Sequence, residues 1–189
     1  MTVREFLFNY RSYTPIPILI VMLILATPTP ASLITGFVIA LSGEFTRIWA
    51  VKHAGGATRT TSGVGGSVLI THGPYGMTRN PLYVGNFLLS TGLVIMAWAW
   101  MPYLLLLFWV LFFFQYSMII SLEEEFLARE FGDAYSKYCA AVPRILPRFT
   151  ELASQSVETM PLARAMQTEK STLTSFTLVS LAIFLRWVF

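Results

Sequence analysis

Charge is scarce in this chain of 189 residues, because only 12% of them are charged, against about 25% in ordinary soluble domains. Cysteine occurs once, at Cys139, which excludes a disulfide framework and a cysteine-based metal site. The two histidines, His53 and His72, have no metal-ligand spacing with each other or with a carboxylate, so no metal is expected. The net charge of +3 is too small to suggest nucleic acid as a partner.

Apolar residues are abundant, at 55% of the chain, and the mean hydropathy is +0.62. These values indicate an integral membrane protein, and the length suits one domain over residues 1–189. A helix needs about 20 apolar residues to cross a bilayer. Five segments approach that length, which predicts an all-α polytopic fold with about five transmembrane helices: 15–27, 33–51, 82–100, 102–122 and 173–189.

The basic residues give a direction to this topology. Of the thirteen Lys and Arg residues, only Arg186 lies on the side opposite to the rest, while the two short turns at 27–32 and 100–102 carry no charge. By the positive-inside rule, the N-terminus and both long loops face the cytoplasm. In a bacterium this would be the inner membrane, with every candidate reactive group at its cytoplasmic face.

Two polar segments lie between the predicted spans. The stretch GGATRTTSGVGG, residues 55–66, is typical of a flexible linker, with a mobile lid as the alternative, and it lacks the G-x-G-x-x-G pattern of a Rossmann site. Residues 151–170 have the pattern of an amphipathic surface helix that Pro161 would kink or restart. This helix and the last span form the C-terminal part, residues 151–189.

The stretch HGPYGMTRNPLYVG, residues 72–85, combines turn signals with side chains that suit a ligand. Pro81 fits the first position of a helix and Asn80 its N-cap, which leaves free backbone N–H groups for an anion. Arg79 adds a forked cation that suits a carboxylate or phosphate. A capped helix start with a snorkelling arginine is an equally good interpretation. Ring faces for a planar base or a cation come from Tyr75 and Tyr83.

The stretch SLEEEFLAREFGDAYSKYCAAVPRILPR, residues 121–148, begins with three glutamates that end a long apolar span. Carboxylates at a membrane edge are costly unless they pair or bind something. We expect this of Glu123 and Glu124, and expect Glu125 and Glu130 to be solvated. Within the second span, Glu44 and Arg47 are three residues apart and can pair on a helix, either as a functional site or as an ion pair at the membrane edge.

Together these stretches resemble the integral-membrane methyltransferases typified by isoprenylcysteine carboxyl methyltransferase and the phospholipid N-methyltransferases. The resemblance covers residues 43–147, the family core, and includes the helix end GEFTRIWA. In the first stretch the matching residues are Gly73, Tyr75, Arg79, Pro81, Tyr83 and Gly85. In the second they are Glu123, Glu124, Leu127, Phe131, Gly132, Tyr135, Tyr138, Val142, Pro143 and Pro147.

The resemblance implies S-adenosylmethionine as methyl donor, in a cofactor pocket closed by the cytoplasmic loops. The two stretches should therefore meet beneath the inner leaflet. A lipid or small amphiphilic acceptor would enter sideways from the membrane. Carried over by position, the catalytic residues are Arg79, Glu123 and Glu124. The cofactor-binding residues are Leu69, Ile70, Tyr75, Asn80, Pro81, Leu82, Tyr83 and Glu124.

Two departures from the family pattern bear on the substrate. Asn80 stands where the family has histidine, so proton transfer at this position is excluded. Residues 116–121 lack the cation that carboxyl methyltransferases of the family carry before the glutamates, which weakens carboxyl methylation of a prenylcysteine. That activity remains an alternative, together with an NADPH-dependent membrane reductase, which shares part of the pattern, and a non-enzymatic membrane subunit.

Overall fold

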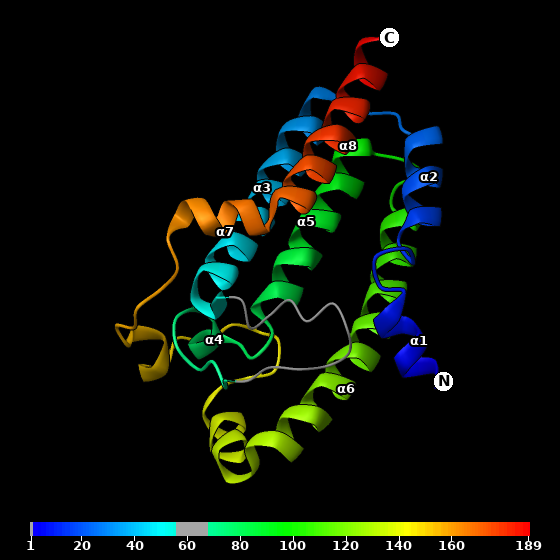
Figure 1. Cartoon of the computed structure of the whole chain (residues 1–189). Coiled ribbons are helices and arrows are strands. Elements are labelled where there is room, and N and C mark those ends of the chain that lie inside the picture. Colours follow the sequence, from blue (N-terminus) through cyan, green and yellow to red (C-terminus); the bar gives the residue numbers. More distant parts are fainter. Residues whose placement is uncertain (1, 56–67) are drawn as a thin grey trace.

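A computed structural model describes residues 2–55 and 68–189 of the chain (Figure 1). Regular structure in these two ranges is helical, without strands, as the sequence predicts. The predicted linker 55–66 lies outside the described residues except for Gly55. The elements are α1 (Val3–Asn9), α2 (Ile16–Ile24), α3 (Pro30–Ala54), α4 (Pro74–Met77), α5 (Pro81–Ala97), α6 (Tyr103–Ala141), the 3₁₀ helix η2 (Glu151–Ser154), α7 (Leu162–Thr168) and α8 (Lys170–Val188).

The elements run between two ends of the molecule. One end holds α1, α4, α7 and the bend of α6, together with the N-terminus; we call it the loop end. The other end holds the turns before α3 and before α6, together with the C-terminus (Figure 1). The segments α2, α3, α5, α6 and α8 lie roughly along the axis that joins these ends, and the short α2 covers only the part near the far end.

The number of spans differs from the prediction. Among the described residues three helices are long and apolar enough to cross a bilayer, namely α3, α6 and α8, whereas five were expected. The first predicted span is only the nine-residue α2, because Pro15 and Pro17 start a new helix instead of extending α1. The third is the 17-residue α5, which ends where Trp98 adopts a left-handed conformation with φ 51°. At 1.5 Å per residue, α5 is about 26 Å long, slightly shorter than a bilayer core.

Glycines bring α3 and α5 into backbone contact. A Cβ atom on Gly43 would collide with the backbone of Leu89 and Gly85, and one on Gly36 would collide with that of Met96 and Gly92. Small residues at helix interfaces allow such close approach where lipid, rather than water, surrounds the helices. The pair α3–α5 is therefore the rigid centre of the fold.

The other helices pack around this pair. One apolar core includes Met22 from α2, Leu104 and Phe108 from α6, and Phe176 and Ile183 from α8, all packed with residues of α3 and α5. This core lies toward the end away from the loops, where the sequence is most apolar. The loop end is organised by polar contacts together with two smaller apolar clusters.

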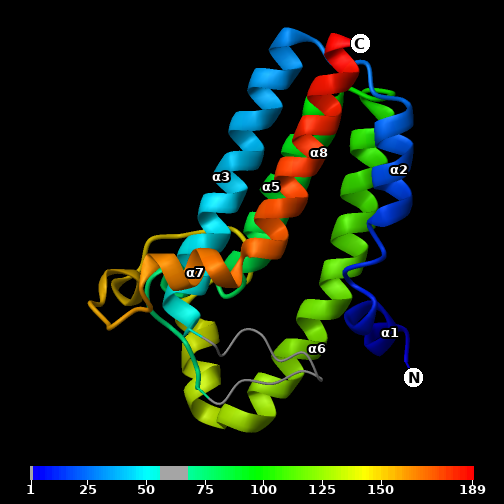
Figure 2. The ribbon, with the colours of Figure 1, turned by 45° about the horizontal axis from the view of Figure 1, so that its top comes forward.

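The helix α6 reverses direction at the loop end (Figure 2). Gly132 adopts φ 48° and ψ −120°, which a residue with a side chain rarely adopts, and the helix continues as a second arm over residues 133–141. Further along, Pro161 precedes α7, so residues 151–170 form a 3₁₀ turn and a separate seven-residue helix instead of one long amphipathic helix. The reversal of α6 returns the chain toward the start of α5.

Candidate functional site

The start of α5 is held by the segment that follows α6. Pro81 occupies the first helical position, as predicted. Asn80 occupies the N-cap position, as predicted, but its side chain makes no capping hydrogen bond. Its Nδ2 instead donates to the main-chain carbonyl of Arg144 at 2.9 Å, because the returning chain offers an acceptor that the sequence pattern could not reveal.

Main-chain hydrogen bonds join the two stretches identified in the sequence. The N–H of Arg79 donates to the carbonyl of Pro143 at 2.9 Å, and the N–H of Arg148 donates to the carbonyl of Met77 at 2.9 Å. The Thr78 hydroxyl donates to the carbonyl of Ile145 at 3.0 Å. These contacts confirm that the two stretches meet, whereas their location beneath the inner leaflet stays a prediction.

Tyr83 and Glu123 form the first polar contact of the site. The Tyr83 hydroxyl, from the first turn of α5, donates to Oε1 of Glu123 on α6 at 2.7 Å. The ring of Tyr83 packs against that of Tyr116, with centroids 4.8 Å apart. Glu123 is therefore held toward α5 rather than toward solvent.

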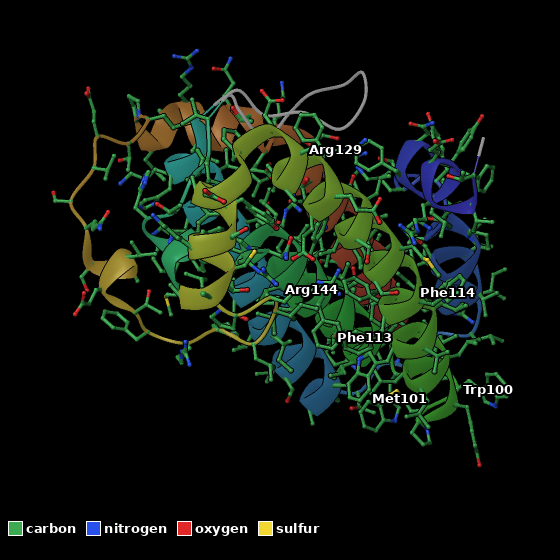
Figure 3. All side chains as sticks on the ribbon, turned by 90° about the horizontal axis from the view of Figure 1, so that it is seen from below. Trp100, Met101, Phe113, Phe114, Arg129 and Arg144 are labelled. Atoms are coloured by element: carbon green, nitrogen blue, oxygen red, sulfur yellow. The ribbon has the colours of Figure 1, made fainter. Side chains whose placement is uncertain are left out.

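Arg79, Glu124 and Arg144 form the second polar contact, which we call the Arg–Glu–Arg triad. Nη2 of Arg79 lies 3.2 Å from Oε1 of Glu124. Nε of Arg144 lies 2.9 Å from Oε2 of Glu124, a contact that is close but not aligned as a hydrogen bond. Nη2 of Arg144 also donates to Oγ of Ser121 at 2.9 Å. Seen from below, Arg144 lies inside the bend of α6 (Figure 3). Sequence reasoning missed Arg144, although it stands within the matching stretch.

Tyr75 is buried beneath the second arm of α6. Its carbonyl accepts a hydrogen bond from the Tyr138 hydroxyl at 2.7 Å, whereas its own hydroxyl has no partner among the described residues. Burial raises the pKa of Tyr75 well above its ordinary value, with a further contribution from Tyr138. The Tyr75 hydroxyl therefore stays protonated and is available for a hydrogen bond.

The predicted apolar residues of the cofactor site lie around these polar contacts. Leu69 packs with the cluster of Tyr135, Tyr138 and Val142. The cluster of Ala50, Ala54 and Tyr75 is covered by Ile70 and Leu82, and Pro81 is fully buried. The structure therefore brings the predicted residues to one region. Their roles stay predictions.

A second polar cluster lies deeper, between α3, α5 and the start of α8. Glu44, which is 1% exposed, lies 4.0 Å from Nε of Arg47, as the spacing predicts. The closer partners of Arg47 come from distant segments, because its guanidinium contacts the carboxylate of Glu169 and the amide oxygen of Asn86. Nδ2 of Asn86 in turn donates to the Tyr116 hydroxyl at 3.2 Å, so this cluster reaches the site.

A surface hollow of about 540 Å³ lies near the second arm of α6. Its lining includes Thr71, Tyr138 and Leu152, but none of the predicted cofactor-binding residues. The predicted cofactor pocket therefore stays a prediction. Within the described ranges no group of three or more potential metal ligands occurs. His53 and His72 contact each other, with ring centroids 5.8 Å apart, and burial together with His53 lowers the pKa of His72.

The three apolar helices and the polar loop end define an integral membrane protein with a candidate ligand site at the loop end. The sequence profile of the phospholipid methyltransferase family matches residues 31–134, more than half of the chain. The chain belongs to the phospholipid methyltransferase family.

Relatives with curated descriptions match parts of the chain. It is 31% identical over 110 residues to the nickel-cobalt-cadmium resistance protein NccN of Alcaligenes xylosoxydans xylosoxydans, covering 58% of this chain and 47% of the relative. It is 30% identical over 114 residues to the cobalt-zinc-cadmium resistance protein CzcN of Cupriavidus metallidurans, covering 60% and 48%. The chain thus spans about half the length of these two relatives.

A third relative carries an enzyme name. The chain is 35% identical over 82 residues to the protein-S-isoprenylcysteine O-methyltransferase of Schizosaccharomyces pombe, covering 42% of this chain and 33% of the relative. No solved structure matches the chain at a comparable level of significance.

Proposed function

We propose that the protein transfers a methyl group from S-adenosylmethionine to a lipid or small amphiphilic acceptor at the cytoplasmic face of the membrane. Membership of the phospholipid methyltransferase family supports the reaction class. The observation that carries the proposal is the paired contact of Tyr83 with Glu123 and of Arg79 with Glu124, at 2.7 and 3.2 Å. These contacts join the two stretches on which the family resemblance rests.

The polar atoms left without partners fit the proposed cofactor. Among the described residues, the Tyr75 hydroxyl and Nε of Arg79 are buried and make no hydrogen bond. Buried polar atoms usually have a hydrogen-bond partner, and a polar ligand would supply one to each of these two atoms. S-adenosylmethionine has a carboxylate, ribose hydroxyls and an adenine ring, and when bound it supplies a methyl group activated by a sulfonium. Arg79 would hold the carboxylate, and Glu123 or Glu124 a hydroxyl or a positive charge.

Methyl transfer mainly requires that the protein align the methyl donor with the acceptor and exclude water. Positioning alone contributes about 7–11 kcal/mol in favourable cases. Tyr83 and Tyr116 offer ring faces beside Glu123, and the apolar residues Leu69, Ile70 and Leu82 surround the polar contacts. Asn80 holds the Arg144 carbonyl and has no proton to exchange near neutral pH, so its role is to position the returning chain.

The proposed orientation of the protein in the membrane rests on the distribution of its basic residues. The loop end carries α1, α4 and α7, and the chain segments at this end hold almost all of the basic residues. By the positive-inside rule this end would face the cytoplasm, with the N-terminus and the site. Arg186, near the C-terminus, would face the opposite side.

Carboxyl methylation of a prenylcysteine-like acceptor is the second candidate. The relative from Schizosaccharomyces pombe favours it. The missing cation in residues 116–121 argued against it, but the guanidinium of Arg144 donates to Ser121 at 2.9 Å and supplies a cation at this turn from another segment. The acceptor carboxylate would then lie near Arg144.

The test is isotope transfer. Membranes with and without the protein are incubated with methyl-labelled S-adenosylmethionine, and their lipids are analysed by mass spectrometry. We expect labelled lipids only with the protein, and calorimetric binding of S-adenosylhomocysteine by the purified chain. Binding of NADPH without S-adenosylhomocysteine would identify a reductase instead. Binding of neither would support a non-enzymatic membrane subunit.

A further inference from the structure

A second surface hollow, of about 460 Å³, lies between α7 and α8, and we call it the α7–α8 hollow. Figures 1 and 2 both show α7 lying across the start of α8, so the hollow is at the loop end of a candidate membrane span. Its lining includes Gln167 and Lys170 at one end and Leu178 about two turns further along α8. The hollow therefore has a polar end near α7 and an apolar end along α8.

The two helices that form the hollow are held in place from their other side. Ala165 is fully buried, and Glu169, four residues later, is 1% exposed. The carboxylate of Glu169 contacts the guanidinium of Arg47 on α3. Residues four apart on a helix share one face, so the buried face of this segment is fixed on α3 and the hollow lies on its outer face. The hollow is therefore formed before any ligand binds.

The polar end of the hollow carries a positive charge. Among the described residues that line it, Lys170 alone is charged, and its ammonium group forms no hydrogen bond or ion pair with another described residue. The two acidic side chains of this region, Glu169 and Glu44, are each 1% exposed and lie beside Arg47. A ligand in the hollow would thus meet the ammonium group rather than these carboxylates. An anionic group such as a phosphate is its complement.

The apolar end of the hollow continues along the membrane-facing side of α8. Leu178, Leu181 and Leu185 are exposed and follow one another at spacings of three and four residues, so they lie on one face of the helix. At 1.5 Å per residue, Lys170 and Leu181 are about 16 Å apart along α8, which matches one leaflet of a hydrocarbon core about 30 Å thick. An acyl chain whose head group lies at Lys170 would therefore run along these leucines.

We propose that the α7–α8 hollow binds one anionic phospholipid, with the phosphate at Lys170 and an acyl chain along α8. This lipid is distinct from the methyl acceptor, because none of the described residues that line the hollow belongs to the candidate site. The inference is independent of the proposed function and requires only that the chain lie in a membrane. One lysine near a membrane surface favours an anionic over a zwitterionic lipid about fivefold.

The test of charge is native mass spectrometry of the full chain in detergent, titrated with dioleoylphosphatidylglycerol or dioleoylphosphatidylcholine. Lys170→Gln removes the charge in the hollow, and Arg164→Gln removes an exposed charge of α7 that does not line it. We expect wild type and Arg164→Gln to bind the phosphatidylglycerol about fivefold more tightly than the phosphatidylcholine. Lys170→Gln should lose this preference, and Lys170→Arg should retain it.

The test of shape fills the hollow without changing its charge. Thr174→Trp places a large side chain in the lining, and Ser175→Trp places the same side chain at the next position of α8, which is exposed and outside the lining. We expect Thr174→Trp to weaken the binding of both phospholipids about tenfold, as the loss of about two buried methylene contacts would. Ser175→Trp should bind as wild type does.

Three results would overturn the inference. The first is an equal preference for phosphatidylglycerol in the Lys170→Gln and Arg164→Gln variants, which would indicate a diffuse effect of surface charge. The second is displacement of the lipid by an equal concentration of glycerol 3-phosphate, which would indicate a site for free phosphate esters. The third is a wild-type dimer that Thr174→Trp abolishes and Ser175→Trp does not, which would show that a second copy of the chain covers the hollow.

The wild-type chain provides an answer that does not depend on the folding of any variant. It is reconstituted in phosphatidylcholine nanodiscs with a small fraction of phosphatidylglycerol that carries a diazirine near its glycerol backbone. After illumination, the cross-linked peptides are identified by mass spectrometry. We expect cross-links within residues 166–178, and cross-links confined to other helices would overturn the proposal.

Discussion

The α3–α5 contact and the loop end hold the fold together by different means. Between α3 and α5, glycines let two backbones touch, so the contact depends on the absence of side chains. At the loop end, Glu124 lies between two guanidinium groups, so the contact depends on the identity of side chains. We expect the α3–α5 contact to tolerate a change in side-chain polarity better than a change in side-chain volume. At the loop end we expect a change in volume to be tolerated better than a change in charge or polarity. Substitutions that separate volume from charge test this difference.

The largest effect is expected from Gly43→Leu. Its side chain would enter the backbone of Leu89 and Gly85, and overpacking of this kind costs about 3 kcal/mol or more of unfolding free energy. The measurement is thermal unfolding of the purified protein in detergent. Thr35→Leu places the same leucine side chain at an exposed position of the same helix and should shift stability by less than about 0.5 kcal/mol. Equal stability of the two variants would contradict backbone contact between α3 and α5.

The next effect concerns Glu124→Gln. The substitution keeps the shape but leaves Arg79 and Arg144 facing each other without a negative charge. We expect the affinity for S-adenosylhomocysteine to fall about tenfold to a hundredfold, in line with the loss of charged contacts. Glu130→Gln, at an exposed position of α6, serves as control in the same calorimetric titration. If both variants bind as wild type does, the triad has no part in cofactor binding.

A smaller effect is expected from Tyr83→Phe. The hydroxyl that donates to Glu123 is lost, while the ring contact with Tyr116 remains. One hydrogen bond to a carboxylate corresponds to a loss of about 1.5 kcal/mol, or roughly tenfold in affinity for S-adenosylhomocysteine at most. Tyr103→Phe, which removes an exposed hydroxyl at the far end of α6, should be silent. A loss as large as that of Glu124→Gln would mean that Tyr83 does more than hold Glu123.

The smallest effect concerns pH. Burial and the neighbouring His53 lower the pKa of His72, so the folded protein binds a proton there less readily than the unfolded chain. The stabilising contribution of neutral His72 is present above the unfolded pKa of about 6.5 and is lost as pH falls through the lower folded value. Melting temperatures between about pH 8 and pH 5 should therefore decline less in His72→Gln than in wild type. Parallel pH profiles would remove His72 as the cause.

Features that depend on a local sequence pattern could be predicted from the sequence alone. Pro81, as a first helical residue, correctly predicted the start of α5. The three-residue spacing of Glu44 and Arg47 correctly predicted their contact. Features that depend on chain reversal were not accessible in this way. Arg144 is twenty residues beyond Glu124 and reaches it only because Gly132 turns α6 back.

Helix length was the other point at which the sequence pattern was misleading. Apolar composition extends through residues 82–100, but the left-handed conformation of Trp98 ends α5 earlier. Asn80 stands at the N-cap as predicted, but its side chain donates to a carbonyl of the returning chain instead of capping the helix. For Asn80 the deciding contact is tertiary, and a single sequence does not contain it.

Arg47 lies within the residues matched by the family profile, whereas its partner Glu169 lies beyond them. Both side chains are largely buried, and a buried charge is costly when a counter-charge is removed. We therefore expect substitutions at these two positions to be correlated among homologous chains, with loss of the acid before the final helix accompanied by loss of the base on α3. Covariation between positions 47 and 169 in an alignment of homologous sequences would reveal which members of the family share this arrangement of the C-terminal helix.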